Sequence, residues 1–334
     1  MAARGPQTAA QPRDRTDQRA ELLLGALASA VLVLIAFMIA FVFAKAWPSF
    51  AHNGLAWFGP GGSVDEQLTA IFNSPSNPAE YVYTLRAWPL VYATALITGA
   101  SVLLGTAISI LAAMFIVEFA PGWIASILQP VVRLLAAVPS VIYGLIGILV
   151  LVPFFGNNII SPERKESVQY VIQLDGSSIL VGTLVLTVMI TPIMIAITVD
   201  ALRSVPRNWT EGAAALGVNR FRALRTVGLR AARPAIVAAA ILSTARALGE
   251  AIMLSMVTGS VAFAPNPLDG VTFFFEPART LAAQIVDGAE GLSVKPFGQT
   301  MYAFAALLLV SSAFLSFGGW MARRSMRKYT LAPR

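Results

Sequence analysis

Residues 22–44 read LLLGALASAVLVLIAFMIAFVFA, a run without a single charged side chain. At a rise of about 1.5 Å per residue, a helix of this length crosses a hydrocarbon core of about 30 Å. Five further apolar runs follow it, at 87–117, 134–152, 179–199, 234–263 and 301–320. Only Arg246 and Glu250 carry charge within the six runs. The sequence therefore predicts an all-α integral membrane protein with six transmembrane helices.

The composition supports the same class and excludes several others. Hydrophobic residues make up 57% of the 334 residues and charged residues only 12%, whereas soluble domains are about 25% charged. The chain has no cysteine, which excludes thiol catalysis, zinc–thiolate sites and disulfides. His52 is the single histidine, so a histidine-rich metal site is not expected. We therefore predict no catalytic residues, no metal site and no cofactor in this chain.

The first run differs from a cleaved signal peptide. Residues 44–46 read Ala-Lys-Ala, which resembles a cleavage site, but the apolar run is far longer than the 7–15 residues of a secretory signal. We predict that residues 22–46 remain as the first transmembrane anchor.

Basic residues concentrate on one side of the predicted membrane. With six spans, the side that holds both termini carries 17 basic and six acidic residues, while the other carries six basic and ten acidic residues. Basic loops stay in the cytoplasm, so we expect a multi-pass protein of the bacterial cell membrane with both termini cytosolic. The predicted regions are a disordered tail (1–21), the anchor (22–46), an outer loop with interfacial segments (47–86), a core of five helices (87–322) that includes a cytosolic loop (204–233), and a basic tail (323–334).

The cytosolic loop predicts two short helices joined by a glycine turn. Asn208 is a suitable N-cap, and Glu211 stands three residues on, where it can complete a capping box. Gly217 is a natural helix stop, and Asn219 can cap a second helix. Ala213, Ala214 and Ala215 make the first helix thin, so it could enter a groove on another protein or rest on the membrane.

Two charges occur inside the fifth predicted span. Arg246 lies about 18 Å along the helix from Pro234, near the middle of the hydrocarbon core, where a charge costs at least about 2.5–3.5 kcal/mol. Glu250 is four residues further on, so the two could form a structural pair on one helix face. Alternatively Arg246 binds an anion, with Ser243 and Thr244 as additional donors, and Glu250 holds the guanidinium between binding events.

The residues of the loop resemble those of a known family. Glu211-Gly-Ala-Ala-Ala-Leu-Gly217, followed by Val227 and Leu229, is similar to the EAA loop of ABC-importer permeases. Gly212 replaces an alanine of that pattern, and Arg230 stands at its usual proline. The resemblance implies a type I importer-like fold and a coupling helix in which Glu211, Ala213, Ala214 and Gly217 dock into a separate cytosolic ATPase.

Two further segments resemble phosphate-importer permeases of the PstC type. These are Ala245-Arg-Ala-Leu-Gly-Glu250 and Pro139-Ser-Val-Ile-Tyr-Gly144. The resemblance implies that Arg246 and Glu250 act in phosphate passage and that Ser140 and Tyr143 line the pathway. It also implies three partners, which are a PstA-like second permease, a PstB-like ATPase dimer that binds ATP and Mg²⁺, and a PstS-like extracytoplasmic phosphate-binding protein. The basic C-terminal end separately predicts contact with membrane lipid, and the net charge of +7 in a membrane protein does not indicate nucleic acid, so none is expected.

The sequence alone leaves other functions open. No G-x-x-x-x-G-K-[ST] motif occurs, so we expect a transport subunit that depends on a separate ATPase and is not itself an enzyme. A permease for sulfate or molybdate would share all general features. A secondary anion transporter would usually show internal repeats, which we do not detect. A membrane scaffold without a transport role would tolerate the loss of Arg246.

Overall fold

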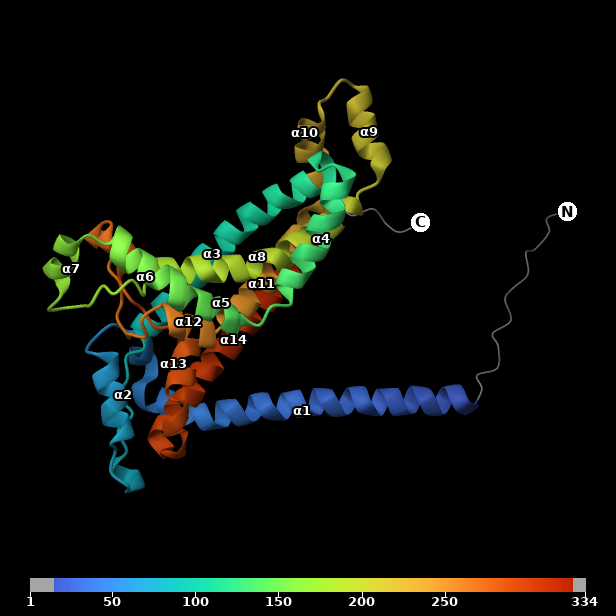
Figure 1. Cartoon of the computed structure of the whole chain (residues 1–334). Coiled ribbons are helices and arrows are strands. Elements are labelled where there is room, and N and C mark those ends of the chain that lie inside the picture. The colour runs from blue at the N-terminus through green and yellow to red at the C-terminus, as the bar shows by residue number, and fades with distance from the viewer. Residues whose placement is uncertain (1–14, 327–334) are drawn as a thin grey trace.

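The computed structural model describes residues 15–326, and nearly all of its regular structure is helical (Figure 1). The principal helices are α1 (Arg15–Asn53), α2 (Val64–Phe72), α3 (Trp88–Met114), α4 (Gly122–Ala136), α5 (Ser140–Ile146), α6 (Val152–Phe154), α7 (Pro162–Val168), α8 (Ile179–Arg203), α9 (Arg207–Ala215), α10 (Arg220–Ala223), α11 (Leu229–Leu248), α12 (Ile252–Val257), α13 (Leu281–Asp287) and α14 (Lys295–Met326). Four π-helical turns extend or join them, at Phe115–Phe119, Gly147–Leu151, Phe155–Ile159 and Leu224–Gly228.

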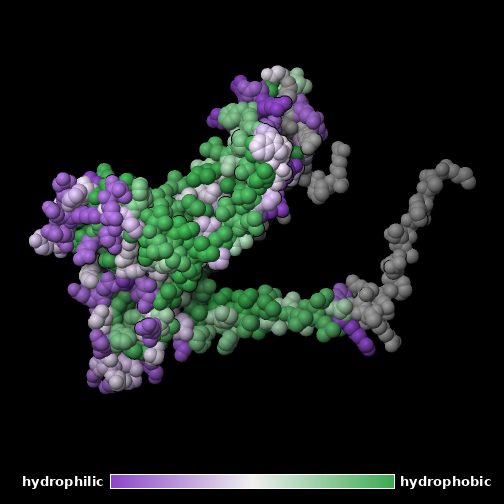
Figure 2. All heavy atoms as spheres, in the orientation of Figure 1, coloured by the Kyte–Doolittle hydropathy of each residue, from purple (hydrophilic) through white to green (hydrophobic). Residues whose placement is uncertain are grey.

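Six helical segments are long and apolar enough to cross a membrane, which confirms the predicted fold class. They cover residues 19–58, 88–119, 140–159, 179–203, 220–248 and 295–321. Figure 2 shows an apolar band between two polar ends, one over α9 and α10 and the other over α2 and α7. We call the first the loop end and the second the opposite end.

Both predicted tails are partly helical. α1 begins at Arg15, so the prediction of disorder is wrong for residues 15–21, and α1 continues through Pro48 to Asn53, beyond the predicted limit of the anchor. α14 continues to Met326, into the predicted basic tail. Arg, Gln and Glu have high helix propensity, so a helix need not end where the apolar run ends. The rest of each predicted tail, residues 1–14 and 327–334, lies outside the described residues.

The third span begins later than predicted. Residues 134–136 belong to α4, and the chain breaks at residues 137–139 before α5 starts at Ser140. Pro139 explains the break, because proline cannot donate a backbone hydrogen bond and forces the preceding residue out of the helical region. The span then continues through the π-helical turns to Ile159.

α1 projects away from the bundle in Figure 1, and its residues from Arg19 to Phe41 are exposed. Only its C-terminal part packs on the body, where the rings of Phe41 and Tyr302 lie 5.8 Å apart. The centre of the body is formed by α3, α8 and α11, whose facing side chains include Ile97, Leu186 and Ile190, all fully buried.

Glycines let α12 approach two neighbouring helices closely. A Cβ added to Gly144 would lie 3.2 Å from the Met253 Cα, and one added to Gly147 would lie 2.5 Å from a Val257 methyl carbon. On α8, a Cβ added to Gly182 would lie 2.5 Å from a methyl carbon of Thr258. The short helix α12 is therefore held between α5 and α8 at contacts that larger side chains would prevent.

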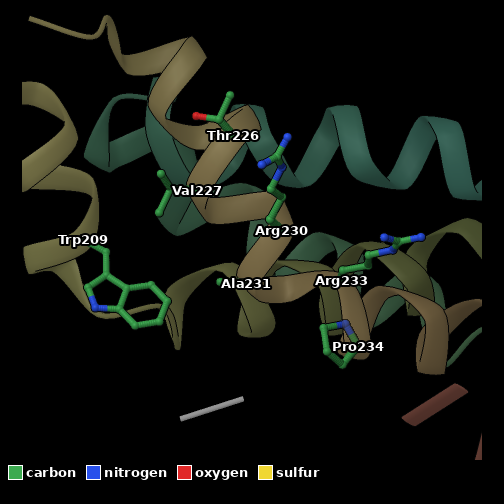
Figure 3. Close-up of a pocket in the computed structure, with 7 residues that line it drawn as sticks. All are labelled: Trp209, Thr226, Val227, Arg230, Ala231, Arg233 and Pro234. Carbon is green, nitrogen blue, oxygen red and sulfur yellow. The ribbon is translucent and has the colours of Figure 1, made fainter. Parts of the chain in front are cut away.

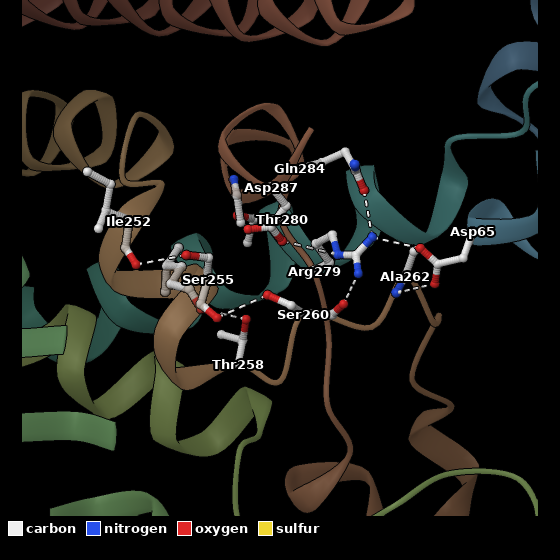
Figure 4. Close-up of polar contacts among 12 residues, drawn as sticks. Asp65, Ile252, Ser255, Thr258, Ser260, Ala262, Arg279, Thr280, Gln284 and Asp287 are labelled. Carbon is white, nitrogen blue, oxygen red and sulfur yellow. Dashed lines mark hydrogen bonds and ion pairs between the residues drawn. The ribbon is translucent and has the colours of Figure 1, made fainter. Parts of the chain in front are cut away.

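A buried guanidinium joins three segments at the opposite end (Figure 4). Arg279 donates from Nη1 to Asp65 Oδ1 on α2 (2.7 Å) and to Gln284 Oε1 on α13 (2.8 Å), and from Nη2 to the Ser260 carbonyl. Its Nε lies 3.5 Å from Asp287 Oδ2, an ion pair without the alignment of a hydrogen bond. The Arg279 side chain is 15% exposed. This network fixes the loop that follows α12 relative to α2 and α13.

Replacing Arg279 with Met should destabilise the opposite end, because the change leaves two carboxylates facing each other without the guanidinium. Asp65 is 48% exposed, so we expect a loss of about 1–2 kcal/mol, less than for a fully buried pair. Thermal unfolding in detergent measures it. Arg279→Lys keeps the charge but lacks the planar fork, and should recover part of the loss. Equal melting of the wild type and Arg279→Met would show that the network does not hold the segments.

Two groups at the opposite end have shifted acidities. Burial raises the pKa of the Glu276 carboxyl, although the Asn266 backbone N–H donates to it at 3.3 Å. Burial likewise raises the pKa of the Tyr83 hydroxyl, which donates to Gln299 Oε1 at 2.6 Å. Both side chains therefore stay protonated, and so neutral, up to a higher pH than they would in water.

Candidate functional site

Arg246 occupies the last turn of α11, where the C-terminal end of the helix dipole favours a positive charge. In the single chain the Arg246 side chain is exposed. Leu242, one turn earlier on the same face of the helix, is 56% exposed. Among the described residues, no carboxylate forms an ion pair with it. The guanidinium therefore lies on an apolar face of a transmembrane helix, without a neutralising partner from the described residues.

The predicted pairing of Arg246 with Glu250 is wrong. The helix ends at Leu248, and residues 249–251 break the chain before α12, so the two charges do not share one helix. Glu250 is only 9% exposed, and its Oε1 accepts a hydrogen bond of 3.3 Å from the Met253 backbone N–H. The apolar pattern of residues 234–263 did not reveal this break. Glu250 therefore acts as a cap of α12 and leaves Arg246 unengaged.

The two hydroxyls predicted near Arg246 differ in their contacts. Thr244 Oγ1 donates back to the Ala240 carbonyl at 2.7 Å, the usual arrangement of a hydroxyl on a helix. Ser243 is buried, and its Oγ has no hydrogen-bond partner among the described residues. Neither hydroxyl therefore forms a hydrogen bond with Arg246 among the described residues.

Tyr143 brings the third span into the neighbourhood of Arg246. The Arg246 charge acts electrostatically on the Tyr143 hydroxyl, which also donates to the Leu135 carbonyl of α4 at 2.9 Å. Tyr143 is largely buried, and Ser140, at the start of α5, is half-buried. The hydrogen bond thus ties Tyr143 to α4, and no hydrogen bond joins Tyr143 to Arg246 among the described residues.

Sequence reasoning missed the element that joins the two motif segments. α12 follows Glu250 directly and packs on α5 at Gly144 and Gly147. The signal available in the sequence was the presence of Gly144 and Gly147 on an apolar segment, because small residues are enriched where transmembrane helices pack closely. The segments 139–144 and 245–250 are therefore parts of one packed unit.

The loop between the fourth and fifth spans forms the predicted helical hairpin. α9 (Arg207–Ala215) ends before Gly217, whose φ of +78° gives the turn, and Asn219 accepts a hydrogen bond of 2.8 Å from the Arg222 N–H and so caps α10. The prediction that Asn208 caps the first helix is wrong, because α9 already includes it. Figure 1 shows the hairpin projecting from the loop end.

The predicted docking residues lie on or next to α9. Glu211 is exposed and Ala213 half-buried, while Gly217 is exposed at the turn. The backbone of Ala214 belongs to α9, and its side chain is outside the described part. From Arg220, one helical segment runs through a π-helical turn and α11 to Leu248, about 40 Å at 1.5 Å per residue. The hairpin is therefore connected by continuous helix to Arg246.

The chain is similar to known membrane transport proteins. The family described as "Binding-protein-dependent transport system inner membrane component" matches residues 105–328. The "Probable ABC transporter permease protein YqgH" of Bacillus subtilis is 35% identical over 263 residues, which cover 78% of this chain and 77% of that protein. The "Phosphate transport system permease protein PstC 1" of Mycobacterium tuberculosis is 34% identical over 222 residues, which cover 63% of this chain and 64% of that protein.

A solved structure confirms the fold. A chain of a bacterial alginate ABC transporter, in complex with a pentasaccharide-bound periplasmic protein, aligns with a TM-score of 0.57 at 15% identity, covering 96% of this chain and 99% of that chain. The six apolar spans and the helical hairpin before the fifth span agree with the family match, which covers about two thirds of the chain. This chain therefore belongs to the family of binding-protein-dependent transport system inner membrane components.

Proposed function

We propose that this chain is a PstC-type permease subunit of an ATP-driven importer that moves inorganic phosphate into the bacterial cytoplasm. Its relatives include proteins named as phosphate transport system permeases, and its fold is that of an importer permease. The sulfate, molybdate, secondary-transport and scaffold alternatives have no such support.

The observation that carries the proposal is the unpaired Arg246 on an exposed apolar face. A guanidinium in contact with lipid costs at least about 2.5–3.5 kcal/mol, so this face must meet a water-filled space or another subunit. A second, PstA-like permease that covers the face would enclose such a space, and this chain would form half of the pathway. Arg246 would then be the fixed positive charge that a passing anion meets.

Phosphate binding at Arg246 uses the chemistry of the guanidinium. Its planar fork donates two parallel hydrogen bonds to two phosphate oxygens, which a lysine ammonium cannot match. Because Glu250 is engaged by the start of α12, it does not compete for these donors. The exposed apolar neighbours weaken the screening by water and thereby strengthen the attraction.

The hairpin of α9 and α10 would transmit motion from the ATPase. A PstB-like ATPase dimer, which binds ATP and Mg²⁺, would bind α9 through Glu211 and the face formed by its alanine residues. Its closure would move the continuous segment 220–248 and with it the surroundings of Arg246. The excess of basic residues at the termini and the hairpin supports a cytoplasmic position of this side. A PstS-like binding protein would deliver phosphate to the opposite end.

Uptake by the reconstituted complex tests the proposal. The chain is purified with its co-eluting subunits, placed in liposomes with ATP on the hairpin side, and supplied with the binding protein and labelled phosphate. We expect ATP-dependent uptake that excess unlabelled phosphate reduces and that sulfate or molybdate does not. Competition by sulfate or molybdate would identify another oxyanion permease, and uptake without an ATPase subunit would identify a secondary transporter.

Glu211→Lys should weaken the association with the ATPase. The change reverses a charge on the exposed face of α9 without touching the membrane core, so the chain should still insert and fold. We expect the recovery of ATPase in a pull-down to fall at least about tenfold, or ATP hydrolysis to continue without transport. Glu166→Lys, the same reversal on the exposed helix α7 at the opposite end, is the control. Unchanged association and coupling in Glu211→Lys would contradict the docking role of α9.

A further inference from the structure

A groove of about 670 Å³ lies between α9 and the first turns of α11 (Figure 3). Trp209 of α9 stands on one side of it, and the helix that leads into the fifth span stands on the other. The proposed docking of the ATPase uses Glu211 and the alanine face, and neither Glu211 nor Ala213 lines the groove. The groove is therefore a feature that the proposed function does not use.

The lining of the groove is divided into an apolar floor and a basic rim. Val227, Ala231 and Pro234 follow at intervals of four and three residues, so they share one face of the helix and lie opposite the Trp209 ring. Arg230 and Arg233, three residues apart, lie together on the adjoining face. Both arginines are exposed. A ligand seated here would meet hydrocarbon on one side and two guanidinium groups on the other.

The arginines stand where the helix enters the membrane. From Pro234 to Ala245 the sequence has no charged residue, whereas Arg230 and Arg233 immediately precede this run. This order places the guanidinium groups at the level of the lipid headgroups and the floor of the groove at the start of the acyl chains. Tryptophan is itself enriched at this level.

We propose that this groove binds an anionic phospholipid, with the headgroup phosphate between Arg230 and Arg233 and the first part of an acyl chain against Trp209 and Pro234. Basic pockets next to transmembrane helices suit such headgroups, because each arginine attracts the anionic charge and the apolar wall receives the chain. The charge pattern requires an anion, and the apolar floor requires that the anion carry hydrocarbon.

The chain's own ends do not fit the groove. The segments outside the described residues are basic, with Arg4 and Arg13 against the single acid Asp14 at one end, and Arg327, Lys328 and Arg334 at the other. Like charges would repel these segments from Arg230 and Arg233. Free inorganic phosphate would satisfy the arginines but would leave the apolar floor uncovered.

Quenching of Trp209 fluorescence tests the proposal on the full chain, purified with its co-eluting subunits and placed in lipid nanodiscs. The lipids carry bromine on their acyl chains, either as phosphatidylglycerol or as phosphatidylcholine at the same mole fraction. Subtracting the signal of Trp209→Phe isolates this tryptophan from the other five. We expect phosphatidylglycerol to quench Trp209 at a far lower mole fraction than phosphatidylcholine, and millimolar inorganic phosphate to leave the quenching unchanged.

Two double variants remove the same charge at different places. Arg230→Gln with Arg233→Gln should raise the mole fraction for half-maximal quenching about 25-fold, or about fivefold for each arginine. Arg222→Gln with Arg225→Gln is the control, because these exposed arginines belong to the same hairpin but do not line the groove. This control should change the mole fraction for half-maximal quenching by less than about fivefold.

Four outcomes would overturn the proposal. Equal quenching by the two lipids would indicate ordinary contact with the bilayer. Equal losses in the two double variants would indicate diffuse charge attraction. Displacement by inorganic phosphate would indicate a free-anion site, and no quenching of Trp209 in the intact assembly would indicate that a partner protein covers the groove.

Discussion

Replacing Arg246 with Met abolishes phosphate uptake and leaves assembly intact; this is the result that we expect for the most sensitive position in the chain. Met keeps much of the volume and hydrophobic length of the arginine stem but removes all five donors. Hydrogen bonds to a charged partner are worth about 1.5–3 kcal/mol each, so the loss of a bidentate pair should reduce uptake about a hundredfold or more. Because Arg246 is exposed on the chain and has no ion-pair partner among the described residues, its removal leaves no buried carboxylate unpaired.

The measurement is ATP-dependent uptake of labelled phosphate by the reconstituted complex. Arg246→Lys keeps the charge without the planar fork and should retain a small part of the activity. Arg19→Met, which removes an exposed arginine near the start of α1, away from the hairpin and from Arg246, is the control and should transport nearly as well as the wild type. Co-elution of all subunits shows that the variants assemble. Normal uptake by an assembled Arg246→Met complex would contradict the proposed role of this residue.

Replacing Gly156 with Ala should prevent the third and fourth spans from meeting correctly. Gly156 lies in the π-helical turn Phe155–Ile159, and a Cβ added to it would lie 2.2 Å from the Asp175 carbonyl oxygen. That atom belongs to the backbone, so it cannot move aside as a flexible side chain would. The next residue, Gly176, has a φ of +107°, and a Cβ added to it would lie 2.7 Å from the Gly156 backbone nitrogen. We expect a loss of at least about 1–3 kcal/mol and a strong decrease in folded yield.

Gly99→Ala is the matched control, because Gly99 lies within α3 and a Cβ added to it meets nothing within 4 Å. Alanine has the higher helix propensity, so this control should be neutral or more stable by up to about 1 kcal/mol. Thermal unfolding of the detergent-solubilised proteins compares the two. Equal stability of Gly156→Ala and the wild type would show that the contact between Gly156 and Asp175 is looser than described.

The sequence predicted the elements whose causes are local. Six apolar runs gave six spans, because the length of a helix that crosses hydrocarbon depends only on its own residues. The glycine turn at Gly217 and the cap at Asn219 were predicted for the same reason, since each needs only the residues next to it. The end of α1 at Asn53 and its start at Arg15 were not predicted, because apolar composition does not determine where a helix stops.

For the site, the sequence by itself determined that Arg246 lies in a membrane-spanning helix and that a hairpin rich in small residues precedes that helix. Only the tertiary structure decided what the neighbouring residues do. It separated Glu250 from Arg246 at the break after Leu248, bonded the Tyr143 hydroxyl to the Leu135 carbonyl of α4, and packed α12 against Gly144, Gly147 and Gly182. These outcomes depend on contacts between segments far apart in the chain. The spacing of residues in the sequence specifies which side chains are neighbours within one helix. Which side chains meet between two helices depends on how closely the two backbones approach.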